Sequence, residues 1–162
     1  MKRILSMLVE NKPGALARVV GLFHQRGYNI ESLNVAPVFD GTYSRLTVTT
    51  KGTENVVEQI TKQINKLIDV IKVADLTEGA HHATELLLLK FKKSDLSSKI
   101  STILKNNKRQ IIEDSKETFI ISIINNSSDI DNLLESIGEK NILEIVRSGS
   151  LGIHESSKTL TI

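Results

Sequence analysis

The sequence predicts an α+β fold made of two consecutive ferredoxin-like βαββαβ units. Its 162 residues suffice for two small domains. Aromatic residues make up only 4% and Trp is absent, so the core has to be built from Ile, Leu and Val, of which Ile and Val favour sheets. Short apolar runs alternate with segments whose apolar residues recur at helical spacing. The order of these segments in the first half returns in the second half with different residues.

The first unit opens with a strand, a turn and a helix. Residues 4–9 form a mostly apolar run of strand type. Pro13 and Gly14 interrupt it, and Pro is favoured in the first turn of a helix. Apolar residues at i, i+3, i+4 and i+7 mark one face of that helix: Leu16, Val19, Val20 and Phe23. Gly27 is well suited to end it.

A hairpin, a second helix and a last strand complete the first unit. Residues 28–38 and 43–50 are predicted strands around the turn signal at Asp40 and Gly41. The second helix begins near Thr53, whose hydroxyl is a favourable cap. Its buried face is marked by Val56, Ile60 and Ile64. Residues 67–73 form the closing strand.

The second half repeats this order after a polar linker of small residues. We predict an N-terminal domain over residues 1–77, the linker over 78–83, and a C-terminal domain over 84–162. The predicted strands are residues 86–91, 110–114, 118–124 and 142–146. The two helices are marked by Leu96, Ile100, Ile103 and Leu104, and by Ile130, Leu133, Leu134 and Ile137.

Such units leave one sheet face without helices. In a ferredoxin-like arrangement both helices pack on the same side of a four-stranded antiparallel sheet. The other face or the edge strands must then be covered by another unit or another chain. We therefore expect the protein to form oligomers.

Composition excludes several classes of function. The formal net charge of +2 is too small to indicate a nucleic-acid or anionic-membrane partner. Cys is absent, which removes disulfides, thiolate ligands and Cys nucleophiles. The apolar run at residues 4–9 is too short for a signal sequence, and none approaches the roughly 18 residues that cross a bilayer. We expect a cytoplasmic protein.

Catalytic and metal-binding patterns are also missing. There is no Walker A loop, no dinucleotide-binding glycine motif and no H-E-x-x-H motif. The sequence contains four histidines, His24, His81, His82 and His154. His24 is better explained as a surface residue than as a ligand, and the adjacent His81 and His82 are better explained as linker residues than as metal ligands. We predict no catalytic residue and no metal site.

RNA binding is the main alternative at the level of the fold. RNA-recognition modules share the βαββαβ order but stack bases on aromatic residues of their two central strands. The corresponding residues 4–9 and 44–49 contain no aromatic side chain, and only Tyr43 lies at one end. The leading alternative function is therefore a stand-alone sensor of small molecules. RNA binding ranks below it.

The break before the first helix is the best candidate for a ligand site. A turn and a helix N-terminus coincide at residues 11–16, and unpaired amides there attract anionic groups. Gly14 has no Cβ, which allows a ligand close to its backbone. The alternative is purely structural: Asn11 caps the helix and Gly14 eases the turn.

The residues around this break resemble a known family. Residues 8–19, LVENKPGALARV, resemble the opening of an ACT domain, a module that senses small molecules. Residues 21–33, GLFHQRGYNIESL, are similar to the small regulatory subunits of acetohydroxyacid (acetolactate) synthase. Residues 35–37, 44–47 and 144–149 support this resemblance. The similarity is dense over residues 2–80 and thin over 84–140.

The resemblance implies a regulatory role. It implies a homodimer whose ACT domains pair side by side and hold valine at their interface, with the effector site at Asn11, Gly14, Ala15, Asn29 and Ile30. The partner it implies is a catalytic large subunit that carries thiamine diphosphate, magnesium and FAD and condenses pyruvate with pyruvate or 2-oxobutyrate. This chain would carry no cofactor itself. It would activate the partner in branched-chain amino-acid biosynthesis and confer feedback inhibition by valine.

Overall fold

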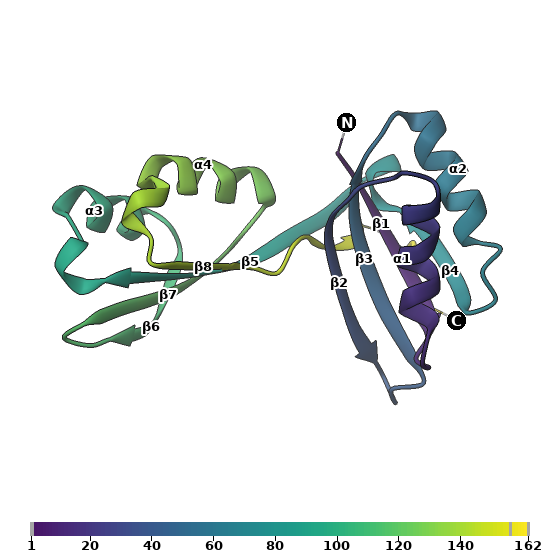
Figure 1. Ribbon diagram of the computed structural model, residues 1–162, viewed down its shortest axis with the longest axis horizontal. Helices are drawn as coiled ribbons and strands as arrows, with labels where there is room; N and C mark the ends of the chain where they lie inside the picture. Colours follow the sequence, from purple (N-terminus) through teal and green to yellow (C-terminus); the bar gives the residue numbers. More distant parts are fainter. Residues whose placement is uncertain (1, 156, 162) are drawn as a thin grey trace. The chain divides into compact units, whose positions relative to one another are not determined.

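The chain folds into two compact units. The computed structural model describes residues 2–155 and 157–161. Unit 1 comprises residues 1–83 and 150–162, and unit 2 comprises residues 84–149. Figure 1 shows the elements of each unit. The predicted α+β class with two ferredoxin-like units is confirmed.

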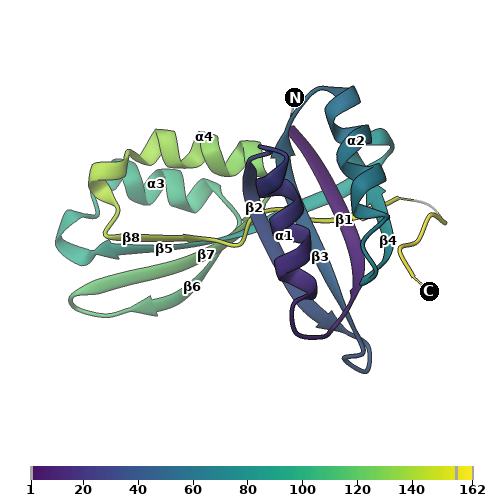
Figure 2. The ribbon, with the colours of Figure 1, turned by 45° about the vertical axis from the view of Figure 1, so that its right-hand side comes forward.

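Unit 1 contains a four-stranded antiparallel sheet in the order β2-β3-β1-β4, with both helices on one face (Figure 2). Its strands are β1 (Lys2–Glu10), β2 (Ile30–Val38), β3 (Tyr43–Lys51) and β4 (Val70–Asp75), and its helices are α1 (Ala15–Gln25) and α2 (Glu54–Ile64). The central strand β1 is buried on both faces. Leu5 and Met7 pack in the core beneath the helices with Phe23, while Ile4 and Leu8 alternate with them and are also buried.

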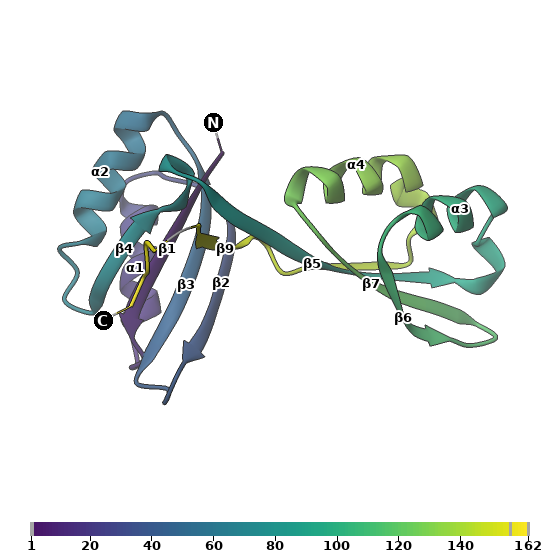
Figure 3. The ribbon, with the colours of Figure 1, turned by 180° about the vertical axis from the view of Figure 1, so that it is seen from behind.

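The other face of this sheet is covered in part by the chain's own C-terminal segment. Strand β9 (Leu151–His154) returns to unit 1 and contacts β1 and the short helix η1 (Leu76–Glu78) (Figure 3). Gly152 permits this approach, because a Cβ there would lie 2.5 Å from Cδ1 of Leu76. Arg45 donates from Nη2 to the Gly152 carbonyl over 3.1 Å.

This return differs from the expected domain boundaries. Residues 84–162 were expected to form one C-terminal domain, yet residues 150–162 belong to unit 1. The expected linker at 78–83 instead contains the end of η1 and the start of strand β5 (His81–Lys92), with which β9 pairs. β9 lacks the continuous apolar run that marked β8 in the sequence, because Gly152 and His154 alternate with its two apolar residues.

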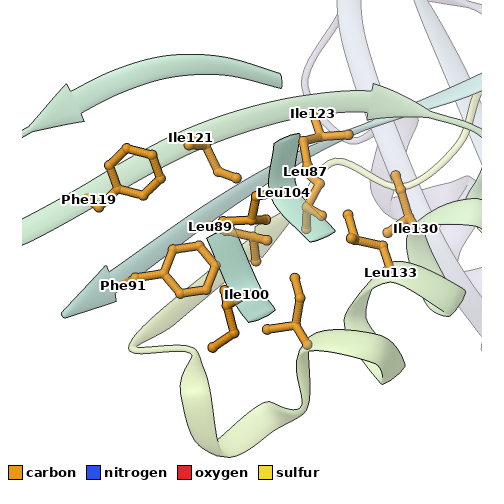
Figure 4. Close-up of a cluster of buried hydrophobic side chains, with 11 residues drawn as sticks. Leu87, Leu89, Phe91, Ile100, Leu104, Phe119, Ile121, Ile123, Ile130 and Leu133 are labelled. Atoms are coloured by element: carbon orange, nitrogen blue, oxygen red, sulfur yellow. The ribbon is translucent and has the colours of Figure 1, made fainter. Parts of the chain in front are cut away.

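Unit 2 repeats the topology with the order β6-β7-β5-β8. Its remaining strands are β6 (Arg109–Asp114), β7 (Thr118–Asn125) and β8 (Glu144–Arg147), its helices are α3 (Ser98–Asn106) and α4 (Ser127–Ile137), and its short helices are η2 (Lys93–Asp95) and η3 (Glu139–Asn141). The side chains of Ser97 and Asn126 cap α3 and α4 by accepting from the amides of Ile100 and Asp129. Figure 4 shows the core, where aliphatic side chains and two Phe residues from β5, β7 and the helices interlock.

The unit 2 sheet presents apolar side chains on the face away from its helices. Leu86, Ile124 and Val146 are 37%, 66% and 50% exposed. The expectation that another chain covers such a face stays a prediction.

Candidate effector site

The turn between β1 and α1 is shaped by one glycine. Gly14 has φ 88 and is the N-cap of α1, with no side chain capping the helix there. This left-handed conformation costs other residues about 1–2 kcal/mol. The amide of Ala15 donates to the carbonyl of Lys12 over 3.2 Å. Leu16 and Ala17 follow in the first helical turn, where amides have no partner within the helix and carry partial positive charge.

Asn11 does not cap the helix, so that part of the structural alternative is wrong, whereas Gly14 does form the turn, with φ 88. Its amide nitrogen Nδ2 donates to the carbonyl of Gly41 over 2.8 Å, and its backbone amide donates to Thr42 over 2.9 Å. Both bonds reach across to the β2–β3 turn. They fix the side chain at the mouth of the β1–α1 turn and use one of its two N–H donors, so that the second N–H can donate and the amide oxygen can accept.

A buried carboxylate fastens this turn to the start of β4. The Asp69 side chain is 1% exposed, and its Oδ2 accepts a hydrogen bond from Nε of Arg18. Nζ of Lys12 lies 3.0 Å from Oδ1. The Arg18 guanidinium, followed by the Lys12 ammonium, holds the pKa of Asp69 below its ordinary value. The carboxylate therefore stays charged and holds both cations beside the N-terminus of α1.

Sequence reasoning missed this cluster. Asp69 lies in the connection between α2 and β4, 51 residues from Arg18. The sequence contains no spacing that pairs them, because only the sheet order places the start of β4 beside the end of β1.

Asn29 and Ile30 lie where the chain leaves α1 and enters β2. Gly27 has φ 69, and the amide of Tyr28 donates to the carbonyl of Phe23 over 2.9 Å, which closes the C-terminal turn. The carbonyl of Asn29 accepts from Oγ1 of Thr50 over 2.7 Å. The Asn29 side chain is exposed and that of Ile30 is partly buried.

The five predicted site residues form two groups within one chain. Asn11, Gly14 and Ala15 gather at the N-terminal end of α1, whereas Asn29 and Ile30 follow its C-terminal end. A helix of 11 residues spans about 16 Å. One amino acid therefore cannot contact both groups of the same chain.

Other sites and membrane segments are not seen in the described part of the chain. Over residues 2–155 and 157–161, no group of three or more His, Asp or Glu residues is placed to hold a metal ion. Within the same residues no helix is long and apolar enough to cross a membrane. Nδ1 of His81 lies 2.9 Å from the Gly79 carbonyl, and Nε2 of His82 lies 3.4 Å from Glu155.

Comparison with known proteins identifies the family. Residues 5–72 match the family described as the AHAS small subunit-like ACT domain, and residues 84–156 match the small subunit of acetolactate synthase. The chain is 43% identical over 162 residues to the acetolactate synthase isozyme 3 small subunit of Escherichia coli (strain K12), covering 99% of both. The chain belongs to the acetolactate synthase small-subunit family.

Further relatives match the chain over nearly its whole length. The probable acetolactate synthase small subunit of Archaeoglobus fulgidus is 35% identical over 98% of this chain and 99% of its own length. The crystal structure of the acetolactate synthase small subunit from Thermotoga maritima superimposes with a TM-score of 0.86 at 32% identity, covering 98% of this chain and 99% of that one. The family resemblance seen in the sequence is thus confirmed, and it includes the second half, where few residues had indicated it.

Proposed function

We propose that this chain is the valine-sensing regulatory subunit of an acetolactate synthase. It activates a catalytic large subunit and makes that enzyme sensitive to the end product of the pathway. The observation that supports the sensing role is the division of the predicted effector residues between the two ends of α1. A site divided in this way is completed when a second copy of the chain lies alongside the first.

The edge of unit 1 suits such a pairing. Strand β2 is nine residues long, lies at the sheet edge and pairs with β3 on one side. Val35 on β2 and Leu16 on α1 are 42% and 36% exposed. Two copies that pack edge to edge, with their two-fold axis perpendicular to β2, run in opposite directions. The N-terminal end of one α1 then approaches the C-terminal end of the other, which joins Asn11 and Gly14 of one copy to Asn29 and Ile30 of its partner.

The assembled residues match the chemistry of valine. First-turn amides near Gly14 bind the carboxylate, while the side-chain amides of Asn11 and Asn29 bind the ammonium and carboxylate groups. Leu16 and Ile30 form an apolar wall for the isopropyl group. Such a wall distinguishes side chains that differ by one methylene by only about 1–3 kcal/mol, so leucine and isoleucine are expected to compete weakly.

The chemistry of the reaction belongs to the catalytic partner. In our proposal that large subunit carries thiamine diphosphate, magnesium and FAD, this chain carries no cofactor, and the complex works in the cytoplasm. Valine acts by shifting the population of the complex towards a less active state, which requires that it bind that state more tightly.

The test is acetolactate formation by the large subunit, with and without this chain, across a valine titration. Activation that valine reverses supports both parts of the proposal. Activation without a valine response would retain the regulatory subunit and reject feedback. Valine binding without activation would favour a stand-alone ACT-type sensor.

A further inference from the structure

A groove runs along the flank of α1 that faces α2. Its volume is about 480 Å³, and residues from both helices and from the α2–β4 connection line it. Three small residues, at the N-cap of α1 and within it, are part of its lining: Gly14, Ala17 and Gly21. A Cβ added at Gly21 would meet no atom within 4 Å, so its glycine leaves the helix backbone open to an approaching chain.

Two arginines give the groove its charge. Arg18 and Arg26 both line it and lie eight residues apart on one helix, which corresponds to about 12 Å. Asp69 orients the Arg18 guanidinium through Nε, and Nη1 of Arg18 lies 3.0 Å from the position a Gly14 Cβ would occupy. Arg26 is the C-cap residue of α1, and its side chain is exposed. None of the described residues that line the groove is acidic, and the Asp69 carboxylate that pairs with Arg18 lies outside the lining.

The rest of the lining suits a peptide. Leu22 and Leu67 add apolar surface, and Gln25 and Gln63 add side-chain amides that both donate and accept hydrogen bonds. Guanidinium groups bind carboxylates through two parallel hydrogen bonds. The complementary occupant is therefore a segment that carries two carboxylates about 12 Å apart with small or apolar residues between them.

The groove and the proposed dimer edge lie on opposite flanks of α1. Leu16 and Val20 follow one flank, and Arg18, Leu22 and Gln25 follow the other, on either side of the buried stripe of Ala15, Val19 and Phe23. Occupation of the groove thus leaves the dimer edge accessible. The groove and the proposed valine site both include Gly14. The β1–α1 turn therefore connects the bound effector with the bound partner.

We propose that this groove, defined by Arg18 and Arg26, binds an acidic segment of the catalytic large subunit. The inference rests on the proposed function, because that function supplies the partner. Binding of the segment fixes Arg18 and, through it, the β1–α1 turn, so the segment and valine influence each other's affinity reciprocally.

The test compares the affinity of the full chain for the large subunit, measured by isothermal titration calorimetry, among charge variants. Arg26→Glu is expected to weaken the complex roughly tenfold or more, since it places a carboxylate against carboxylates. Arg26→Lys keeps the charge but loses the paired hydrogen bonds, and we expect an intermediate effect. Lys99→Glu is the matched control, because Lys99 is exposed on α3 and the charge change is identical.

The outcomes separate this inference from the function on which it rests. The groove is supported if Arg26→Glu weakens binding to the large subunit and Lys99→Glu does not. Each isolated variant should still bind valine with unchanged affinity. Wild-type affinity in Arg26→Glu overturns the groove and leaves the regulatory function intact. Failure of the wild-type chain to bind or activate the large subunit overturns both.

Discussion

Arg18 donates a hydrogen bond from Nε to the buried carboxylate of Asp69, 51 residues further along the chain. Lys12 adds a second positive charge to the same carboxylate. The bond ties the second turn of α1 to the start of β4, so the turn at Gly14 is held from both sides. Both proposals made above place a ligand beside this turn.

Replacement of Asp69 by Asn tests the cluster. Asp69→Asn removes the charge that holds Arg18 and Lys12, and we expect lower stability and weaker valine binding. Urea unfolding and valine calorimetry measure the two effects. Asp114→Asn is the control, because the Asp114–Lys93 pair is exposed and such pairs contribute about 0–1 kcal/mol. Equal stability of Asp69→Asn and wild type would contradict the structural role.

The same pair predicts a dependence on pH. The folded-state pKa of Asp69 is lowered by Arg18 and Lys12. A group of this kind contributes stability that is complete above its unfolded pKa, about 4 for Asp, and is lost as the pH falls through the lower folded value. The difference in unfolding free energy between wild type and Asp69→Asn should therefore shrink when the pH is taken from 7 to 3. A constant difference would show that the carboxylate charge is not responsible.

Much of the fold was readable from the sequence because burial leaves a periodic pattern. Val19 and Phe23 mark the buried face of α1, and the apolar run at residues 4–9 marks the central strand β1. β9 was missed because Gly152 interrupts its apolar residues, so it shows no apolar run of the kind that marked residues 142–146. The Asp69 cluster was missed because its members meet only through the sheet order. Asn11 donates to the carbonyl of Gly41. This bond could not be predicted, because the sequence does not show that the β2–β3 turn lies beside the β1–α1 turn.

The return of the C-terminal segment makes Gly152 a sensitive position. Gly152→Ala would bring a Cβ within 2.5 Å of the buried Leu76 side chain and 3.5 Å of the His82 carbonyl. Overpacking of this kind costs about 1–3 kcal/mol. Gly79→Ala is the matched control, since nothing lies within 4 Å of its added Cβ, and we expect a change within about 0.5 kcal/mol. Urea unfolding of both variants measures the difference; similar stabilities would show that β9 does not pack tightly on unit 1.

The effector turn can be tested by adding charge at Gly14. Gly14→Asp places a carboxylate where the valine carboxylate is proposed to bind, beside Arg18, and we expect loss of the valine response. Maximal activation should remain at saturating large subunit. Gly14→Ala carries the same backbone cost of about 1–2 kcal/mol without the charge, and it should keep part of the response. Activity across a valine titration measures each; a fully valine-sensitive Gly14→Asp would refute the site.

The division of the effector residues between two copies predicts complementation between defective variants. Asn11→Ala damages the group at the N-terminal end of α1, and Asn29→Ala damages the group at its C-terminal end, so neither homodimer retains an intact site. In a heterodimer of the two variants, one site carries both lesions and the other carries neither. Unfolding and refolding an equal mixture should therefore restore valine binding to about one quarter of the sites, since half of the dimers are mixed and one site in each is intact.

Calorimetry of the refolded mixture against each variant alone gives the answer. Each variant refolded alone and then mixed without unfolding is the control for slow exchange of subunits. Recovered sites with wild-type affinity would establish that valine lies between two chains. If mass spectrometry demonstrates mixed dimers but no valine binding is recovered, the two groups of residues do not form one site across the dimer interface. Feedback through a shared interface would then have no basis. The result thus decides whether valine binds between two chains, where it can respond to the geometry of the dimer, or at the β1–α1 turn of a single chain.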